Sequence, residues 1–246
     1  MDGFVKQDYL RPMRRPAVIA HRGASGYEYE NSPAAFRRAV ELGADGVELD
    51  IHATRDGAIV VHHDADVPGA GPIAQLTGEE ARRVRLPNGE TLPLLSEVLD
   101  LLPDRDVWVE VKSLPPIHDP LLLEVLDRGS CPERYAVHSF DHGIVRRLGE
   151  ARPNLRRGIL LSACPDDPVS AMRAVGATAL WQEWQQVDAE LVRRVHDAGG
   201  ILIAWTVNAA GDVVRLARMG VDGLCGNYPD RMRMALAARV EEGSGT

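Results

Sequence analysis

Two acidic side chains, Glu48 and Asp50, lie two residues apart in the apolar run GVELDI. Side chains alternate along a strand, so both carboxylates should point to the same side of it. Carboxylates held together repel one another, and burying them uncompensated is costly. A cation would resolve the conflict, and Glu110 in the run VWVEV could supply a third oxygen ligand. Oxygen ligands without thiolates suit one divalent metal ion, Mg²⁺ or Ca²⁺. The alternative is an acidic strand end paired with arginines.

Two histidines flank these acids in the sequence, His21 after the run AVIA and His63 in the segment VVHHD. Histidine has a pKa near neutrality, so a pair can supply the base and the acid that cleavage of a phosphodiester needs. His62 adjoins His63, but strand alternation sends the two side chains to opposite faces. The remaining histidines are interpreted as surface, outer-sphere or packing residues: His52, His118, His138, His142 and His196.

An acidic chain that binds an anionic substrate needs local cations. The net charge is −8, which gives no general basic field for nucleic acid and predicts no nucleic-acid partner. Arg22 follows His21, and Lys112 is one of only two lysines in the chain. A compact ammonium at a strand end suits a phosphate oxygen, and it could also pair with a metal-ligand carboxylate.

Short apolar runs alternate with amphipathic stretches along most of the chain, and this pattern predicts eight strand–helix pairs. The predicted strands are residues 17–20, 46–51, 107–111, 135–139, 157–161, 177–181, 201–205 and 222–225. The predicted helices are residues 32–42, 94–102, 119–128, 141–150, 168–175, 188–198, 210–219 and 229–240. We therefore expect an α/β fold, a single (β/α)₈ (TIM) barrel, in which reactive residues gather at the carboxyl ends of the strands.

Local signals refine this prediction. The Arg-Asp-Gly turn in TRDGAIVVHHD predicts a small hairpin insertion after the second strand. Helix N-caps are expected at Asp141, Asp188 and Asp230, and helix ends at Gly43, Gly176, Gly199 and Gly220. Residues 1–15 are expected to be an irregular leader, 16–240 the barrel domain, and 241–246 a flexible tail.

Composition bears on the location of the protein. The sequence has no apolar run of membrane-spanning length and no secretory signal pattern. The three cysteines, Cys131, Cys164 and Cys225, are far apart and odd in number, which is typical of reduced thiols. We expect a cytoplasmic protein without stable membrane insertion.

The segments described above resemble the glycerophosphodiester phosphodiesterase family. The similarity runs from residues 21–64 and VEVK (109–112) through SFD (139–141) and AWTVN (204–208) to 220–230. It implies a barrel that hydrolyses glycerophosphodiesters to sn-glycerol 3-phosphate and an alcohol. The resemblance implies that His21 and His63 are catalytic and that Glu48, Asp50 and Glu110 hold the metal. It does not decide which histidine is the base, and our working assignment is His21.

The resemblance also extends to substrate-contacting and outer residues. It implies that Arg22 and Lys112 contact the phosphate and that Glu30, beside Asn31, lies close to the metal as an outer partner. Trp205 is expected to form an apolar wall beside the substrate, although a packing role at the barrel rim is an alternative.

This chain departs from the family pattern at several places. Ser32 replaces the usual threonine, the segment after Asp64 lacks the usual R-T-T-x-G run, and Gly226 and Asn227 stand where threonine and aspartate are common. These changes leave open which alcohol is preferred. Two other functions remain possible on this scaffold: a lysophospholipase D-type phosphodiesterase and a non-catalytic phosphate-ligand binder.

Overall fold

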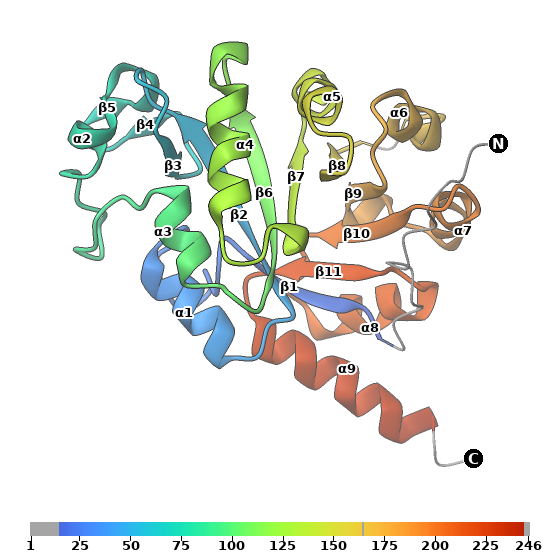
Figure 1. Cartoon of the computed structure of the whole chain (residues 1–246). Coiled ribbons are helices and arrows are strands. Elements are labelled where there is room, and N and C mark those ends of the chain that lie inside the picture. Colours follow the sequence, from blue (N-terminus) through green and yellow to red (C-terminus); the bar gives the residue numbers. More distant parts are fainter. Residues whose placement is uncertain (1–14, 164, 244–246) are drawn as a thin grey trace.

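The computed structural model describes residues 15–163 and 165–243, and these form a closed parallel β-barrel surrounded by helices (Figure 1). The strands follow the order β1-β11-β10-β9-β8-β7-β6-β2, and β1 pairs with β2 to close the ring. The barrel strands are β1 (Ala17–His21), β2 (Gly46–Ala53), β6 (Asp106–Ser113), β7 (Tyr135–Ser139), β8 (Arg156–Leu161), β9 (Ala179–Glu183), β10 (Ile201–Trp205) and β11 (Gly223–Gly226). The predicted (β/α)₈ barrel is thereby confirmed.

The predicted hairpin follows the second strand. Strand β3 (Ile59–Val61) pairs antiparallel with β2. The hydroxyl of Thr54 tightens the turn, because it lies 2.6 Å from a carboxylate oxygen of Asp56 and accepts the backbone N–H of Ala58 at 2.9 Å. Beyond it, β4 (Asp66–Val67), β5 (Gly71–Pro72), η1 (Ile73–Gln75) and α2 (Gly78–Ala81) form a further insertion that was not predicted. These elements are too short to show a periodicity.

Helices return the chain from each strand to the next. They are α1 (Pro33–Glu41), α3 (Leu95–Asp100), η2 (Pro116–His118), α4 (Asp119–Arg128), η3 (Pro132–Arg134), α5 (His142–Ala151), α6 (Pro168–Ala174), η4 (Trp184–Gln186), α7 (Ala189–Asp197), α8 (Ala210–Met219) and α9 (Pro229–Gly243). Residues 1–14 of the predicted leader and 244–246 of the predicted tail lie outside the described residues.

Most of the predicted N-caps and helix-ending glycines are confirmed. Asp141 and Asp188 cap α5 and α7 by accepting the backbone N–H groups of Gly143 and Leu191. The prediction for Asp230 was wrong, because Asp230 lies inside the first turn of α9 and accepts the Tyr27 hydroxyl instead. Gly43, Gly176, Gly199 and Gly220 all have the positive φ expected just after a helix.

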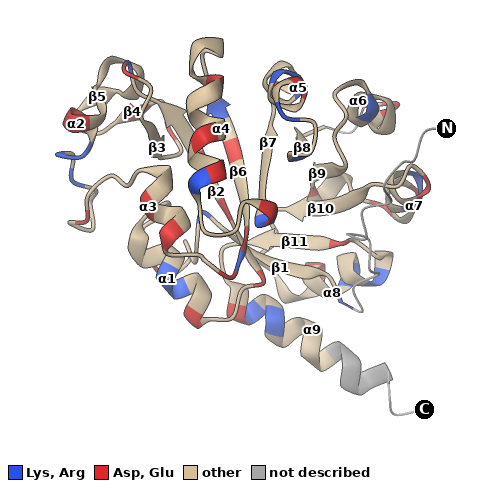
Figure 2. Cartoon of the chain, in the orientation of Figure 1, with Lys and Arg blue, Asp and Glu red and all other residues tan. Residues whose placement is uncertain are grey.

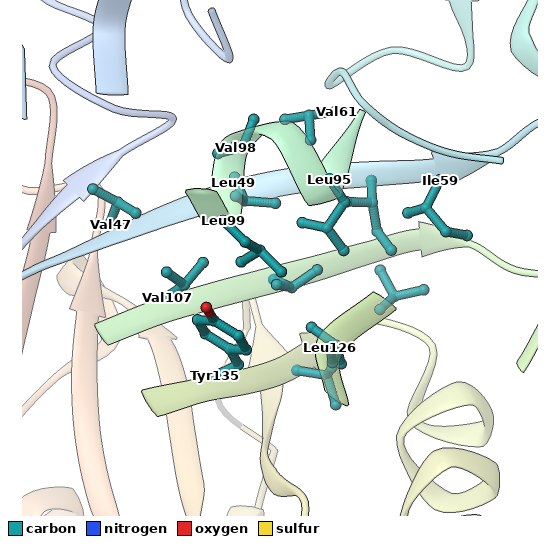
Figure 3. Close-up of a cluster of buried hydrophobic side chains, with 14 of the residues drawn as sticks. Val47, Leu49, Ile59, Val61, Leu95, Val98, Leu99, Val107, Leu126 and Tyr135 are labelled. Atoms are coloured by element: carbon teal, nitrogen blue, oxygen red, sulfur yellow. The ribbon is translucent and has the colours of Figure 1, made fainter. Parts of the chain in front are cut away.

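Strand alternation places apolar and acidic side chains on opposite sides of β2. Val47 and Leu49 pack outward in a large cluster with α3 and α4, which Figure 3 shows. The residues between and after them, Glu48 and Asp50, therefore face the barrel interior. A smaller cluster that includes Trp108, Trp181, Ile203 and Cys225 fills the interior. This arrangement positions the polar site above a packed barrel core.

The outer surface carries both signs of charge. On α4, blue and red segments lie close together in Figure 2, and Arg128 there pairs with Glu124 one turn earlier. In the described part of the chain, no helix combines the length and apolarity that crossing a membrane requires. Cys131 and Cys225 are free thiols, whereas Cys164 lies outside the described residues.

Candidate active site

A small open cavity lies at the carboxyl ends of the barrel strands and has a volume of about 110 Å³. It brings together seven of the predicted site residues. Its lining is His21, Arg22, Glu48, His63, Glu110, Lys112, His138, Phe140, Leu160, Trp181, Trp205 and Cys225. The remaining predicted residues, Asp50, Glu30 and Asn31, each contact the lining residue Arg22. The sequence-based grouping therefore corresponds to one place in the fold.

Three buried carboxylates form the centre of the site. Glu48, Asp50 and Glu110 each offer one oxygen, and these oxygens lie within 4.8 Å of one another. Burial, together with the neighbouring charge of Asp50, raises the pKa of Glu110 to about 7. The pKa of Glu48 is raised well above its usual value by burial and by the charges of Asp50 and Glu110. The positive charges of Arg22 and Lys112 are therefore too weak to keep all three carboxyl groups ionised at neutral pH.

Asp50 differs from its two neighbours because cations lie beside it. Burial alone would raise the pKa of Asp50, but the charges of Lys112 and Arg22 outweigh it and lower the pKa. The Lys112 Nζ lies 3.0 Å from Asp50 Oδ1 and 2.7 Å from Glu110 Oε1. The Arg22 Nε lies 3.1 Å from Asp50 Oδ2. Asp50 thus anchors both cations at the edge of the triad.

The loop after β1 holds Arg22 in place. Arg22 and Asn31 both have a φ of 55°, an uncommon left-handed conformation, and the Asn31 N–H donates to the Arg22 carbonyl at 3.0 Å. The Arg22 Nη1 donates to Glu30, 2.9 Å from each oxygen, and the Arg22 backbone N–H donates to Glu48 at 3.1 Å. Asn31 donates its amide to Asp50 at 2.8 Å. Glu30 and Asn31 therefore contact Arg22 and Asp50 from outside the triad.

The two predicted acid–base histidines differ in environment. Burial and the nearby charge of Arg22 lower the pKa of His21 to about 4, so that its ring is neutral at pH 7. The His21 Nδ1 lies 2.9 Å from the amide oxygen of Asn227. His63 is more exposed, and its Nδ1 lies 2.8 Å from Asp64 Oδ1. As predicted, His62 does not join the cavity, and its Nδ1 contacts the Asp64 carbonyl instead.

The three carboxylates fit a divalent cation. All three donors are hard oxygens, they are close enough to share one ion, and burial makes their mutual charge costly without one. An ion here would also hold β2 and β6 together, since Asp50 and Glu110 are register partners across these two strands.

Several lining residues were not predicted as site residues. His138 was interpreted as a surface, outer-sphere or packing residue, yet it lines the cavity and is only 1% exposed. Phe140 is 47% exposed and stacks edge-on against Trp205, with ring centroids 5.6 Å apart. His138 lies near the carboxyl end of the predicted strand 135–139. This position could have indicated that it lines the site, because site residues of a barrel gather at the carboxyl ends of its strands.

The fold and the site define a barrel enzyme built to act on an anionic substrate, with a candidate metal centre beside two cations and two histidines. Residues 21–231 match the model of the Glycerophosphoryl diester phosphodiesterase family. A glycerophosphodiester phosphodiesterase of Caldanaerobacter subterraneus subsp. tengcongensis is 35% identical over 231 residues, which cover 87% of this chain and 95% of that protein. The chain belongs to the glycerophosphoryl diester phosphodiesterase family.

Solved structures show the same fold. A glycerophosphodiester phosphodiesterase from Parabacteroides distasonis aligns with a TM-score of 0.82 and 26% identity, covering 92% of this chain and 98% of that one. A phosphodiesterase from Oleispira antarctica was solved in complex with the product sn-glycerol-3-phosphate. It aligns with a TM-score of 0.85 and 24% identity, covering 91% of this chain and 97% of that one.

Proposed function

We propose that this protein hydrolyses glycerophosphodiesters to sn-glycerol 3-phosphate and an alcohol, with one divalent ion held by Glu48, Asp50 and Glu110. The observation that carries the proposal is one cavity lined by Glu48, Glu110, two cations and two histidines, with the third carboxylate, Asp50, held beside it by the same two cations. Family membership and the product bound to the Oleispira antarctica relative support it.

Arg22 and Lys112 are the proposed phosphate contacts. Both side chains line the cavity, and each is already held by carboxylates, so little further ordering is needed when an anion binds. Together they would neutralise charge that develops on the non-bridging oxygens. The ion, when bound, adds Lewis-acid stabilisation of the same charge. We propose Mg²⁺ or Ca²⁺ from the oxygen-only ligand set.

His21 and His63 are the proposed acid–base pair. The neutral ring of His21 can accept a proton at pH 7, which suits the base. Asp64 accepts a hydrogen bond at the His63 Nδ1, and this leaves Nε2 to donate a proton to the leaving alkoxide. The nucleophile is either water or a hydroxyl of the substrate, and the second route passes through a cyclic phosphate.

The lysophospholipase D alternative has one supporting observation, the half-exposed Phe140 against Trp205 beside the cavity. Family membership and the product bound to the Oleispira antarctica relative point to a glycerophosphodiester instead. The glycerophosphodiester is therefore the favoured substrate class, and a location in the cytoplasm remains a prediction.

A substrate panel tests the proposal. Release of sn-glycerol 3-phosphate is measured with glycerophosphodiesters of choline, ethanolamine and glycerol, and alcohol release with lysophosphatidylcholine. We expect turnover of the first three that exceeds turnover of lysophosphatidylcholine at least tenfold. Preference for the lysolipid would favour a lysophospholipase D-type enzyme. Binding of phosphate ligands without turnover of any substrate in the panel would indicate a non-catalytic binder.

A further inference from the structure

His138 is a buried histidine that the mechanism above does not use. It lies in β7 between two barrel strands, as register partner of Glu110 on β6 and of Gly158 on β8. Its ring packs against Trp181 and Trp108, with ring centroids 4.2 Å and 5.8 Å away. It therefore lies on top of the barrel core, directly below the cavity that it lines.

Neither ring nitrogen of His138 has a hydrogen-bonding partner among the described residues, although the side chain is only 1% exposed. The indole N–H groups of Trp181 and Trp205 are likewise buried without a partner in this part of the chain, and both residues line the same cavity. Buried polar groups are normally satisfied, so such a group requires an explanation. Packing alone does not provide one, since a phenylalanine would fill the same space without the desolvation cost.

The geometry places His138 beside the proposed metal centre but outside it. Its Nε2 lies 3.8 Å from Glu48 Oε1, too far for a hydrogen bond. The group of candidate ligand atoms within 4.8 Å of one another consists of oxygens of Glu48, Asp50 and Glu110. No atom of His138 is part of it. A molecule bound in the cavity is thus a better partner for this ring than the ion.

We propose that His138 is a specificity-determining residue that hydrogen-bonds a hydroxyl of the substrate's glyceryl group. This inference rests on the proposed function. A buried neutral imidazole has one donor and one acceptor nitrogen, and a hydroxyl is also both donor and acceptor. The phosphate has Arg22 and Lys112 on the cavity wall, whereas His138 and the two indoles offer uncharged groups suited to a polyol.

The test compares two ligands that differ only in their hydroxyls. Glycerol 3-phosphate and propyl phosphate are titrated by calorimetry into the metal-loaded protein, into His138→Phe and into His138→Gln. We expect the unchanged protein to prefer glycerol 3-phosphate about tenfold or more. His138→Phe should lose most of this preference through weaker binding of glycerol 3-phosphate alone. His138→Gln keeps a donor and an acceptor and should retain it.

Two controls separate this role from others. The affinity for the metal ion, measured without phosphate ligand, should stay the same in His138→Phe. A tenfold loss there would mean that His138 supports Glu48, and would overturn the proposal. His142→Phe, on α5, is the matched variant, because the Nε2 of His142 lies 3.4 Å from the Leu160 carbonyl and its side chain is not part of the cavity lining.

The outcomes also distinguish this inference from the proposed function. If the unchanged protein hydrolyses glycerophosphodiesters and His138→Phe keeps the full preference for glycerol 3-phosphate, only the assignment of His138 fails. If the unchanged protein shows neither turnover nor preference between the two ligands, the proposed function fails and this inference fails with it.

Discussion

The three carboxylates of the triad respond differently to the same buried surroundings. Asp50 has Lys112 and Arg22 within 3.1 Å and remains ionised. Glu110 also contacts Lys112, yet burial and the charge of Asp50 keep its pKa near 7. A metal ion must therefore displace a proton that the triad holds at and below neutral pH.

Metal affinity should accordingly depend on pH. Below a pKa of about 7 the Glu110 carboxyl is protonated, so lowering the pH favours the proton over the ion. We expect the apparent association constant for Mg²⁺ or Ca²⁺ to fall about tenfold or more between pH 6.5 and pH 5.5, because the raised pKa of Glu48 adds a second competing proton. Calorimetry in two buffers of different ionisation enthalpy should show proton release. A pH-independent affinity without proton release would contradict this account of the triad.

Removal of either proposed acid–base group should impair the chemical step. We expect His21→Ala and His63→Ala each to lower kcat by about 10²- to 10⁴-fold, because a positioned acid or base contributes that much. The matched variant is His196→Ala, whose exposed ring contacts Asp222 away from the cavity. Steady-state kinetics with a glycerophosphodiester gives the values, and full activity in His21→Ala would exclude His21 as a catalytic residue.

At the scale of elements, the end of β1 and the turn after it place His21 and Arg22 in the site. Gly23 follows them with a φ of 77°, and a Cβ at this position would lie 2.6 Å from the Ala35 carbonyl carbon in α1. Glycine is required here by both the backbone conformation and the close approach of α1. The HRG order in the sequence thus has a structural reason.

Gly23→Ala should therefore be costly to both stability and activity. We expect the free energy of unfolding in urea to fall by more than about 1 kcal/mol, with a loss of kcat as Arg22 is displaced. Gly211→Ala is the control, since this helical glycine of α8 has open space around its Cβ position. That change should be neutral or stabilising by about 0.4–1 kcal/mol. Equal effects of the two substitutions would argue against a special role for Gly23.

Elements with a long, regular pattern could be predicted from the sequence. The predicted helices 119–128 and 210–219 agree with α4 and α8 to the residue, because the apolar period and the flanking signals coincide. The insertion after β3 could not be predicted, since β4 and β5 have two residues each.

The sequence predicted Glu48 and Asp50 as site residues because the alternation of side chains along β2 can be recognised from neighbouring residues alone. The role of His138 depends on what β6, β8 and β9 place around it, which no local pattern contains.

At the scale of the whole molecule, the site is connected to the closure of the barrel. β2 pairs with β1 on one side and with β6 on the other, and the three carboxylates lie on β2 and β6. An ion bound only by the folded barrel stabilises the whole domain by mass action.

We therefore expect a saturable stabilisation by metal. At pH 7.5, an ion at 100 times its dissociation constant should raise the free energy of unfolding by about 2.7 kcal/mol. Denaturant titrations with and without chelator measure this difference. Glu48→Gln should remove most of it, while the conservative change Glu133→Gln, in η3 outside the cavity lining, should keep it. No stabilisation in the unchanged protein would count against a metal site in the triad.

The most direct test of the central claim is the product formed from glycerophosphocholine, followed by ³¹P NMR with and without chelator. We expect one new phosphomonoester, sn-glycerol 3-phosphate, formed together with choline, and loss of this reaction when the divalent ion is removed. Formation of phosphocholine and glycerol, or undiminished turnover in chelator, would contradict it.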